Sequence, residues 1–189
     1  TGADGMMANV LFVITSAGVV VLDTGASVQI GEMAIRRLRT LTDKPVVAVI
    51  NSHYHGDHFL GNDAFVQAFG AALPIHAHPQ TRRQIEGLAG SGWRLAMERW
   101  TNGATLGTQV VVPNRDAGHG DVLRFGDTTL KIHHHGRAHT DADLFRLSRD
   151  YVGDTAETLS LIWPDRGAGT PPSLAQVVGW LTLNHGALD

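Results

Sequence analysis

The 189-residue chain contains no cysteine. This absence excludes disulfide bonds, thiolate nucleophiles and metal sites built on sulfur ligands. No apolar run approaches the roughly 18 residues that a membrane-spanning helix needs, so no membrane partner is expected. Charged residues make up 17% of the chain and hydrophobic residues 43%, a balance that favours a folded core over disorder.

A large excess of charge of one sign is also missing. Lys and Arg number 15 and Asp and Glu number 18, which gives a formal net charge of −3. Nucleic acid is therefore not an expected partner, because phosphate binding needs a basic face. The length favours one domain over residues 1–189. Neither end resembles a natural terminus, so we expect a chain truncated at both ends.

Hydrophobic periodicity predicts alternating strands and helices. Two β-rich portions, each accompanied by helices, predict an α/β protein with two mixed sheets face to face and helices outside, an αββα sandwich. The predicted strands are 10–15, 19–22, 46–50, 73–76, 110–112, 122–125, 128–133 and 144–147, and the predicted helices are 29–41, 61–69, 80–100 with a break at 90–92, and 171–183.

Histidine is abundant, with eleven residues, and four potential metal ligands stand within six positions after a predicted buried strand. These four are His53, His55, Asp57 and His58. His53 and His55 alternate, so in extended backbone their side chains point the same way. A turn at Gly56 can bring the other two to an adjacent site. Imidazole and carboxylate without thiolate suit zinc, manganese or iron.

This His-x-His-x-Asp-His motif resembles the metallo-β-lactamase superfamily of metallohydrolases. Three further segments are similar to that superfamily: 20–25 resembles its strand-Asp-x-Gly element, 59–62 the segment after the metal loop, and 136–144 its third-histidine motif. The nearest subgroup is the β-lactamase-like and quinoprotein-relay zinc hydrolases. The resemblance implies the metallo-β-lactamase fold and weakly favours a periplasmic or secreted location.

The resemblance also implies two sets of metal ligands. His53, His55 and His139 would hold the first ion, and Asp57 and His58 would hold a second. A histidine rather than a glutamate at position 55 favours zinc over a di-iron centre. We therefore expect one or two Zn²⁺ per chain.

Three more residues have assignments that leave alternatives open. Asp23 would orient a ligand or loop by hydrogen bonds, or else cap a helix. Asp154 matches the bridging carboxylate of thioesterase-like members, or else belongs to an ordinary turn. His185 would complete the second metal site, or else the true ligand lies beyond Asp189. The helix predicted before His185 favours the latter.

Other histidines and tryptophans are weaker candidates. At most one or two of the consecutive histidines 133–135 can approach the site, because neighbouring side chains on a strand alternate faces. His76, His78 and His119 are expected at an edge or on the surface. Trp93 and Trp100 are seven residues apart, a helical spacing that more often indicates core packing than substrate contact.

The resemblance implies a zinc-dependent hydrolase in which a metal-bound hydroxide attacks a carbonyl of a small-molecule substrate. Asp57 would be catalytic as well as a ligand, accepting a hydrogen bond from the nucleophile. A β-lactam or related amide is the favoured substrate, and the alternatives are a glyoxalase II-like thioester or ester hydrolase and a metal-binding module without turnover. An aspartic protease with Asp23-Thr24-Gly25 would need a homodimer and leaves the histidine loop unexplained.

Overall fold

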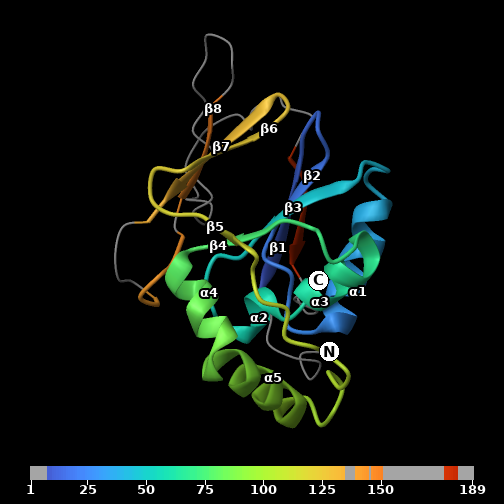
Figure 1. Ribbon diagram of the computed structural model, residues 1–189. Helices are drawn as coiled ribbons and strands as arrows, with labels where there is room; N and C mark the ends of the chain where they lie inside the picture. Colours follow the sequence, from blue (N-terminus) through green and yellow to red (C-terminus); the bar gives the residue numbers. More distant parts are fainter. Residues whose placement is uncertain (1–7, 135–138, 145, 151–176, 183–189) are drawn as a thin grey trace, which may run out of the picture.

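The computed structural model describes residues 8–134, 139–144, 146–150 and 177–182 (Figure 1). The sequence-predicted site residues Asp154 and His185 lie outside these ranges. Within the described ranges, no helix has the length and apolar character needed to cross a membrane.

A six-stranded sheet forms the centre of the molecule, in the order β5-β4-β3-β2-β1-β9. The run from β2 to β5 is parallel, whereas β1 is antiparallel to both of its neighbours. The strands are β1 (Asn9–Ile14), β2 (Val19–Leu22), β3 (Val46–Ile50), β4 (Ile75–Ala77), β5 (Arg115–Asp116) and β9 (Val177–Thr182).

A second, three-stranded sheet faces the first and is antiparallel throughout. Its strands are β6 (Val122–Phe125), β7 (Thr128–His133) and β8 (Arg146–Asp150). Buried residues from both sheets form one cluster, in which Val20, Ala48 and Ile50 pack with Leu130 and Ile132. Successive side chains along a strand point to opposite faces of its sheet. One face of the larger sheet therefore packs on the smaller sheet, and its other face is left for helices.

The helices α1 (Val28–Arg39) and α3 (Asn62–Phe69) cover that opposite face. Ala34 and Leu38 of α1 are fully buried against strand residues at helical spacing, and Phe65 of α3 joins them. Two facing sheets, with helices on the outer face of the larger one, confirm the predicted α/β fold class, although the smaller sheet is antiparallel and not mixed. The remaining helices, α2 (Gly56–Phe59), α4 (Pro79–Glu86) and α5 (Leu88–Trp100), lie together at one end of the sheets (Figure 1).

The prediction of a final helix over 171–183 was wrong over its second half, where the chain forms β9. This strand pairs with the free edge of β1. Its sequence, Val-Val-Gly-Trp-Leu-Thr, contains the β-branched and aromatic residues that suit strands. Residues 177–182 form a strand, so the helix that made His185 a poor ligand candidate is not present there.

Two smaller boundaries also differ from prediction. The helix break falls at Gly87, which has extended backbone and ends α4 while starting α5. Gly90 instead lies buried within α5, where a Cβ atom would be 2.0 Å from the carbonyl oxygen of Ile85. Residues 110–112 form no strand, and Val110 and Val112 pack their side chains against the cluster that contains Phe59.

The loops after β2 and β3 are locked to each other at the end of the sheet. The Asn51 and Asn62 amides exchange hydrogen bonds at 3.1 and 2.8 Å, and Thr24 Oγ1 donates to Asn62 Oδ1 at 2.9 Å. Gly61 permits this approach, since a Cβ there would lie 2.0 Å from the Thr24 carbonyl oxygen. The network fixes the loop that carries the histidines.

Candidate metal centre

The histidine loop begins where β3 ends, at the carboxyl edge of the parallel strands. Residues 51–55 are irregular, and His55 has extended backbone immediately before α2. The chain bends at 53–54 between the two histidines, so the predicted extended segment is not continuous, and Asp57 and His58 lie on the short helix α2. In α/β sheets, functional groups commonly gather at this strand edge.

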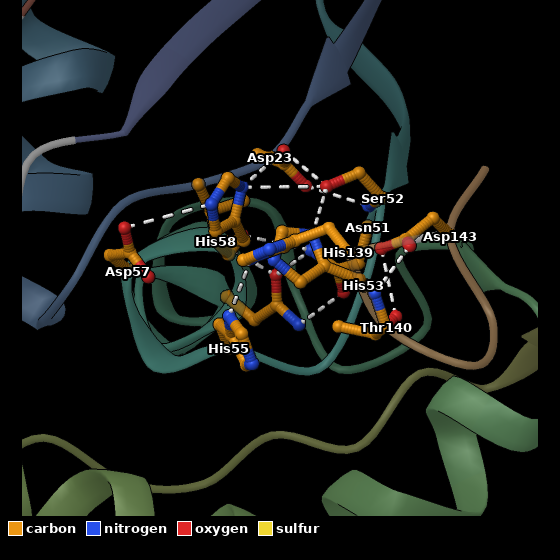
Figure 2. Close-up of polar contacts among 12 residues, drawn as sticks. Asp23, Asn51, Ser52, His53, His55, Asp57, His58, His139, Thr140 and Asp143 are labelled. Carbon is orange, nitrogen blue, oxygen red and sulfur yellow. Dashed lines mark hydrogen bonds and ion pairs between the residues drawn. The ribbon is translucent and has the colours of Figure 1, made fainter. Parts of the chain in front are cut away.

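Three histidines converge at the centre of the site (Figure 2). One ligand atom from each of His53, His55 and His139 can be chosen so that all three lie within 4.8 Å of one another. His139 Nε2 lies 3.0 Å from His55 Nδ1, although the two residues are 84 positions apart. In the part of the chain that the structure describes, no other group of three or more His, Asp or Glu side chains meets this criterion.

The donor atoms of this cluster fit a zinc ion. His53 Nε2 is buried and has no hydrogen-bond partner, and a buried polar atom without a partner is costly. The three rings meet edge-on, with centroids 4.7 to 5.0 Å apart. Three neutral imidazoles around one point form a common zinc site, with the fourth position left for water or substrate.

Ser52, which the sequence analysis did not single out, controls the orientation of His53. Its Oγ donates to Asp23 Oδ2 at 2.7 Å and lies 2.9 Å from His53 Nδ1. Because the serine hydroxyl donates its hydrogen bond to the carboxylate, Oγ can accept a hydrogen bond from His53 Nδ1–H. This tautomer leaves the lone pair of His53 on the buried Nε2, which faces the cluster.

Asp23 acts through hydrogen bonds and does not cap α1, whose N-cap is Ser27. Its carboxylate accepts the Ser52 backbone N–H at 2.7 Å and contacts His58 Nδ1 at 2.7 Å. The backbone of Asp23 has φ 56°, a left-handed conformation that is uncommon outside glycine but tolerated by Asp and Asn. This conformation, together with its hydrogen bonds, holds the Asp23 carboxylate against the histidine loop.

Asp57 and His58 lie beside the three-histidine cluster and outside it. The ring of His58 is 4.0 Å from that of His53 between centroids, and its Nε2 is 3.6 Å from Asp57 Oδ2. Asp57 is 8% exposed. These two side chains present an imidazole and a carboxylate to the same space, as the prediction of a second metal position requires.

Burial lowers the pKa of His53 and His55. Burial, reinforced by the charge of His58, lowers the pKa of His53 to about 4, and burial together with His139 lowers that of His55. Burial also acts to lower the pKa of His58, but the adjacent Asp23 outweighs it and raises that pKa above its ordinary value. His53 and His55 are therefore neutral at pH 7, the form that binds metal.

The loop that carries His139 is braced by its own carboxylate. Asp143 accepts from the backbone N–H and the hydroxyl of Thr140, at 2.5 and 2.8 Å, and the Leu144 backbone N–H donates to the Ser52 carbonyl at 3.0 Å. The sequence analysis missed Asp143, although Thr140-x-x-Asp143 is a spacing at which local side-chain to backbone bonds form.

The remaining described histidines stand apart from the cluster. His134 lies against His78, with ring centroids 4.5 Å apart, and contacts the Asp143 carbonyl oxygen through Nδ1 at 2.9 Å. His133 and His119 are in ring contact at 5.8 Å. These positions agree with their low rank as ligands, and His135 lies outside the described residues.

Without metal, the chain should lose stability as pH falls from 6.5 towards 4. The ordinary pKa is 6.5 and the folded pKa of His53 is about 4, so the unfolded chain binds a proton in this window that the folded chain does not. His53→Asn should remove up to about 3 kcal/mol of this dependence. His58 acts oppositely, because its stabilisation is complete below 6.5 and is lost as pH rises through its raised pKa.

Urea unfolding of chelator-treated protein at several pH values from 7 to 4 measures this slope. Each protein is compared with its own stability at pH 7, which removes the constant cost of the substitution. If stability fell with pH equally in the wild-type chain and in His53→Asn, the lowered pKa of His53 would be contradicted.

Comparison with known proteins agrees with this geometry. A profile of the Metallo-beta-lactamase superfamily matches residues 3–185. A metallo-beta-lactamase from Pontibacter korlensis superposes with a TM-score of 0.52 at 20% identity, covering 70% of this chain and 51% of that one. One from Cronobacter sakazakii has a TM-score of 0.55 at 19% identity, covering 74% and 53%.

A linear primary-alkylsulfatase from a Pseudomonas species is 39% identical over 49 residues, which are 26% of this chain and 9% of that protein. The chain thus spans about half the length of the two solved lactamases and a small part of the alkylsulfatase. At these identities the solved structures establish the fold, and the profile match covers nearly the whole sequence. The chain belongs to the metallo-beta-lactamase superfamily.

Proposed function

We propose that this protein is a zinc-dependent hydrolase that cleaves a carbonyl-containing bond of a small molecule, with β-lactams and related amides as the first substrate class. The convergence of three imidazoles on one point, with the Nε2 atom of His53 buried and unpartnered, carries the proposal. Members of the superfamily are mostly hydrolases. Zinc bound there would supply a Lewis acid and make water reactive near neutral pH.

The protein's own side chains would position the reactants. Asp57 is nearly buried beside the cluster, so its carboxylate can accept a hydrogen bond from the attacking water and fix its direction. His58 shares a proton with Asp23 at Nδ1 and turns its other nitrogen towards Asp57. In this proposal, Asp57 and His58 also hold the second zinc.

A sulfate ester is the second candidate substrate class. It is favoured by the 39% identity to a linear primary-alkylsulfatase, which extends over only 49 residues. The thioesterase alternative depended on Asp154, which lies outside the described residues, so no structural observation adds to it.

Turnover by the full chain tests the proposal. Nitrocefin, p-nitrophenyl acetate and hexyl sulfate are supplied separately to protein loaded with zinc, to protein stripped by chelator and to stripped protein given zinc again. We expect nitrocefin hydrolysis that disappears with the metal and returns with it. Hexyl sulfate cleavage alone would replace the first substrate class by the second. Zinc binding without turnover of any substrate would contradict the proposal and indicate a binding module.

A further inference from the structure

Helix α5 packs directly on the histidine loop. It contacts α2, the helix that carries Asp57 and His58, and the two lie close together in Figure 1. A Cβ atom on Gly56 would be 3.0 Å from Cβ of Trp93 and 3.3 Å from Cε of Met97. Side chains of α5 therefore border the site at Gly56, between His55 and His58.

Two indoles on α5 lead from the site to the surface. The Trp93 ring lies 4.9 Å from the His55 ring, and the Trp100 ring lies 6.0 Å from Trp93, both measured between centroids. Trp93 is half-buried against the cluster around Phe59, whereas Trp100 is 56% exposed. We call the pair Trp93 and Trp100 the indole surface.

The exposure of Trp100 is not explained by core packing. The seven-residue spacing of the tryptophans favoured core packing, but the buried residues of α5 are Gly90 and Met97. Of the charged residues between the tryptophans, Arg94 and Glu98 pair with each other, and Arg99 is exposed. An apolar aromatic surface continuous with a few converging polar groups is the usual composition of a small-molecule site.

We propose that the indole surface binds a hydrocarbon group of the substrate. The preferred substrate is then an amphiphile, in which an alkyl or acyl chain is attached to the bond that is hydrolysed. The reacting bond would lie at His55 and the chain would run over Trp93 towards Trp100. This inference rests on the proposed hydrolase function of the same site and narrows its substrate class.

Binding of linear alkanesulfonates, which are not hydrolysed, tests the inference without turnover. Calorimetry on the zinc-loaded chain compares 1-butanesulfonate with 1-octanesulfonate. Partial burial of each of the four added methylenes should tighten binding about twofold, so we expect octanesulfonate to bind about 16-fold more tightly. Equal affinity for the two probes would overturn the inference.

Variants of α5 locate the effect. Trp100→Ala should reduce the preference for octanesulfonate to about twofold or less, and Trp100→Phe should keep most of it. Because Trp100 is exposed, the substitution leaves the core intact. Leu88→Ala is the matched control, since Leu88 is a 90% exposed apolar residue of the same helix. If Leu88→Ala lowered the preference as much as Trp100→Ala, the indole surface would not be the site.

Hydrolysis of p-nitrophenyl acetate and p-nitrophenyl octanoate separates this inference from the proposed function. Zinc-dependent hydrolysis of both esters with equal kcat/KM would support the function and overturn the chain preference. Binding of octanesulfonate through Trp100, without hydrolysis of any substrate, would support the indole surface and overturn the function.

Discussion

Replacing His55 with alanine should abolish zinc binding at the three-histidine cluster. His55 Nδ1 lies 3.0 Å from His139 Nε2, so its loss leaves two imidazoles where three converge. The zinc affinity should fall by more than the roughly 10- to 100-fold that loss of an outer hydrogen bond costs. The His55 side chain makes no capping bond to α2, so the helix keeps its start. Metal analysis after dialysis measures the effect.

His78→Ala is the matched control for this substitution. His78 is also a half-exposed histidine that precedes a helix, but it lies against His134 and its Nδ1 accepts the Gln80 backbone N–H. Losing that cap should cost about 1 kcal/mol of stability and leave the zinc content unchanged. Equal zinc content in the two variants would refute the ligand assignment.

Asp23→Asn should weaken the second zinc position about 10- to 100-fold. The carboxylate accepts from the Ser52 backbone and hydroxyl and from His58, whereas an amide has a single oxygen to accept these bonds. Asparagine tolerates the left-handed backbone at this position, so the change is confined to the side chain. His58 then loses the partner that orients it. Competition with a chromophoric chelator measures the affinity of each site.

Asp63→Asn controls for the loss of a buried carboxylate. Asp63 is 4% exposed and accepts from the Gln67 amide and the Gln109 backbone N–H, away from the histidines. It should lower the free energy of unfolding without affecting either zinc affinity. If Asp23→Asn left the second affinity at the wild-type value, the hydrogen bond to His58 would not position a ligand.

The sequence predicts best those parts of the site that are local. His53 and His55 stand two positions apart on the loop after a buried strand, so their proximity follows from the local sequence. His139 lies 84 positions from His55, and only the resemblance to a known superfamily connected them. The role of Ser52 depends on the loop after β2 packing beside it, information that no single segment contains. The bonds between Thr140 and Asp143 are local, and their spacing could have predicted them.

The fold shows the same division. The hydrophobic stripe of α1 and the apolar runs of the central strands predict their elements, because each depends on its own periodicity. The segment Val177–Thr182 was predicted as part of a helix and forms a strand. The prediction failed because the strand depends on pairing with β1, more than 160 positions earlier in the chain. The spacing of Trp93 and Trp100 favoured core packing, yet Trp100 is 56% exposed and Met97 is the buried side chain of this turn.

X-ray absorption spectroscopy of the zinc-loaded chain tests the central claim most directly. With one zinc per chain held by His53, His55 and His139, the first shell should contain three imidazole nitrogens at about 2.0–2.1 Å and one further light ligand, and in His55→Ala this three-imidazole shell should be lost. A shell made of oxygen alone, or an unchanged imidazole shell in His55→Ala, would place the metal elsewhere and contradict the account.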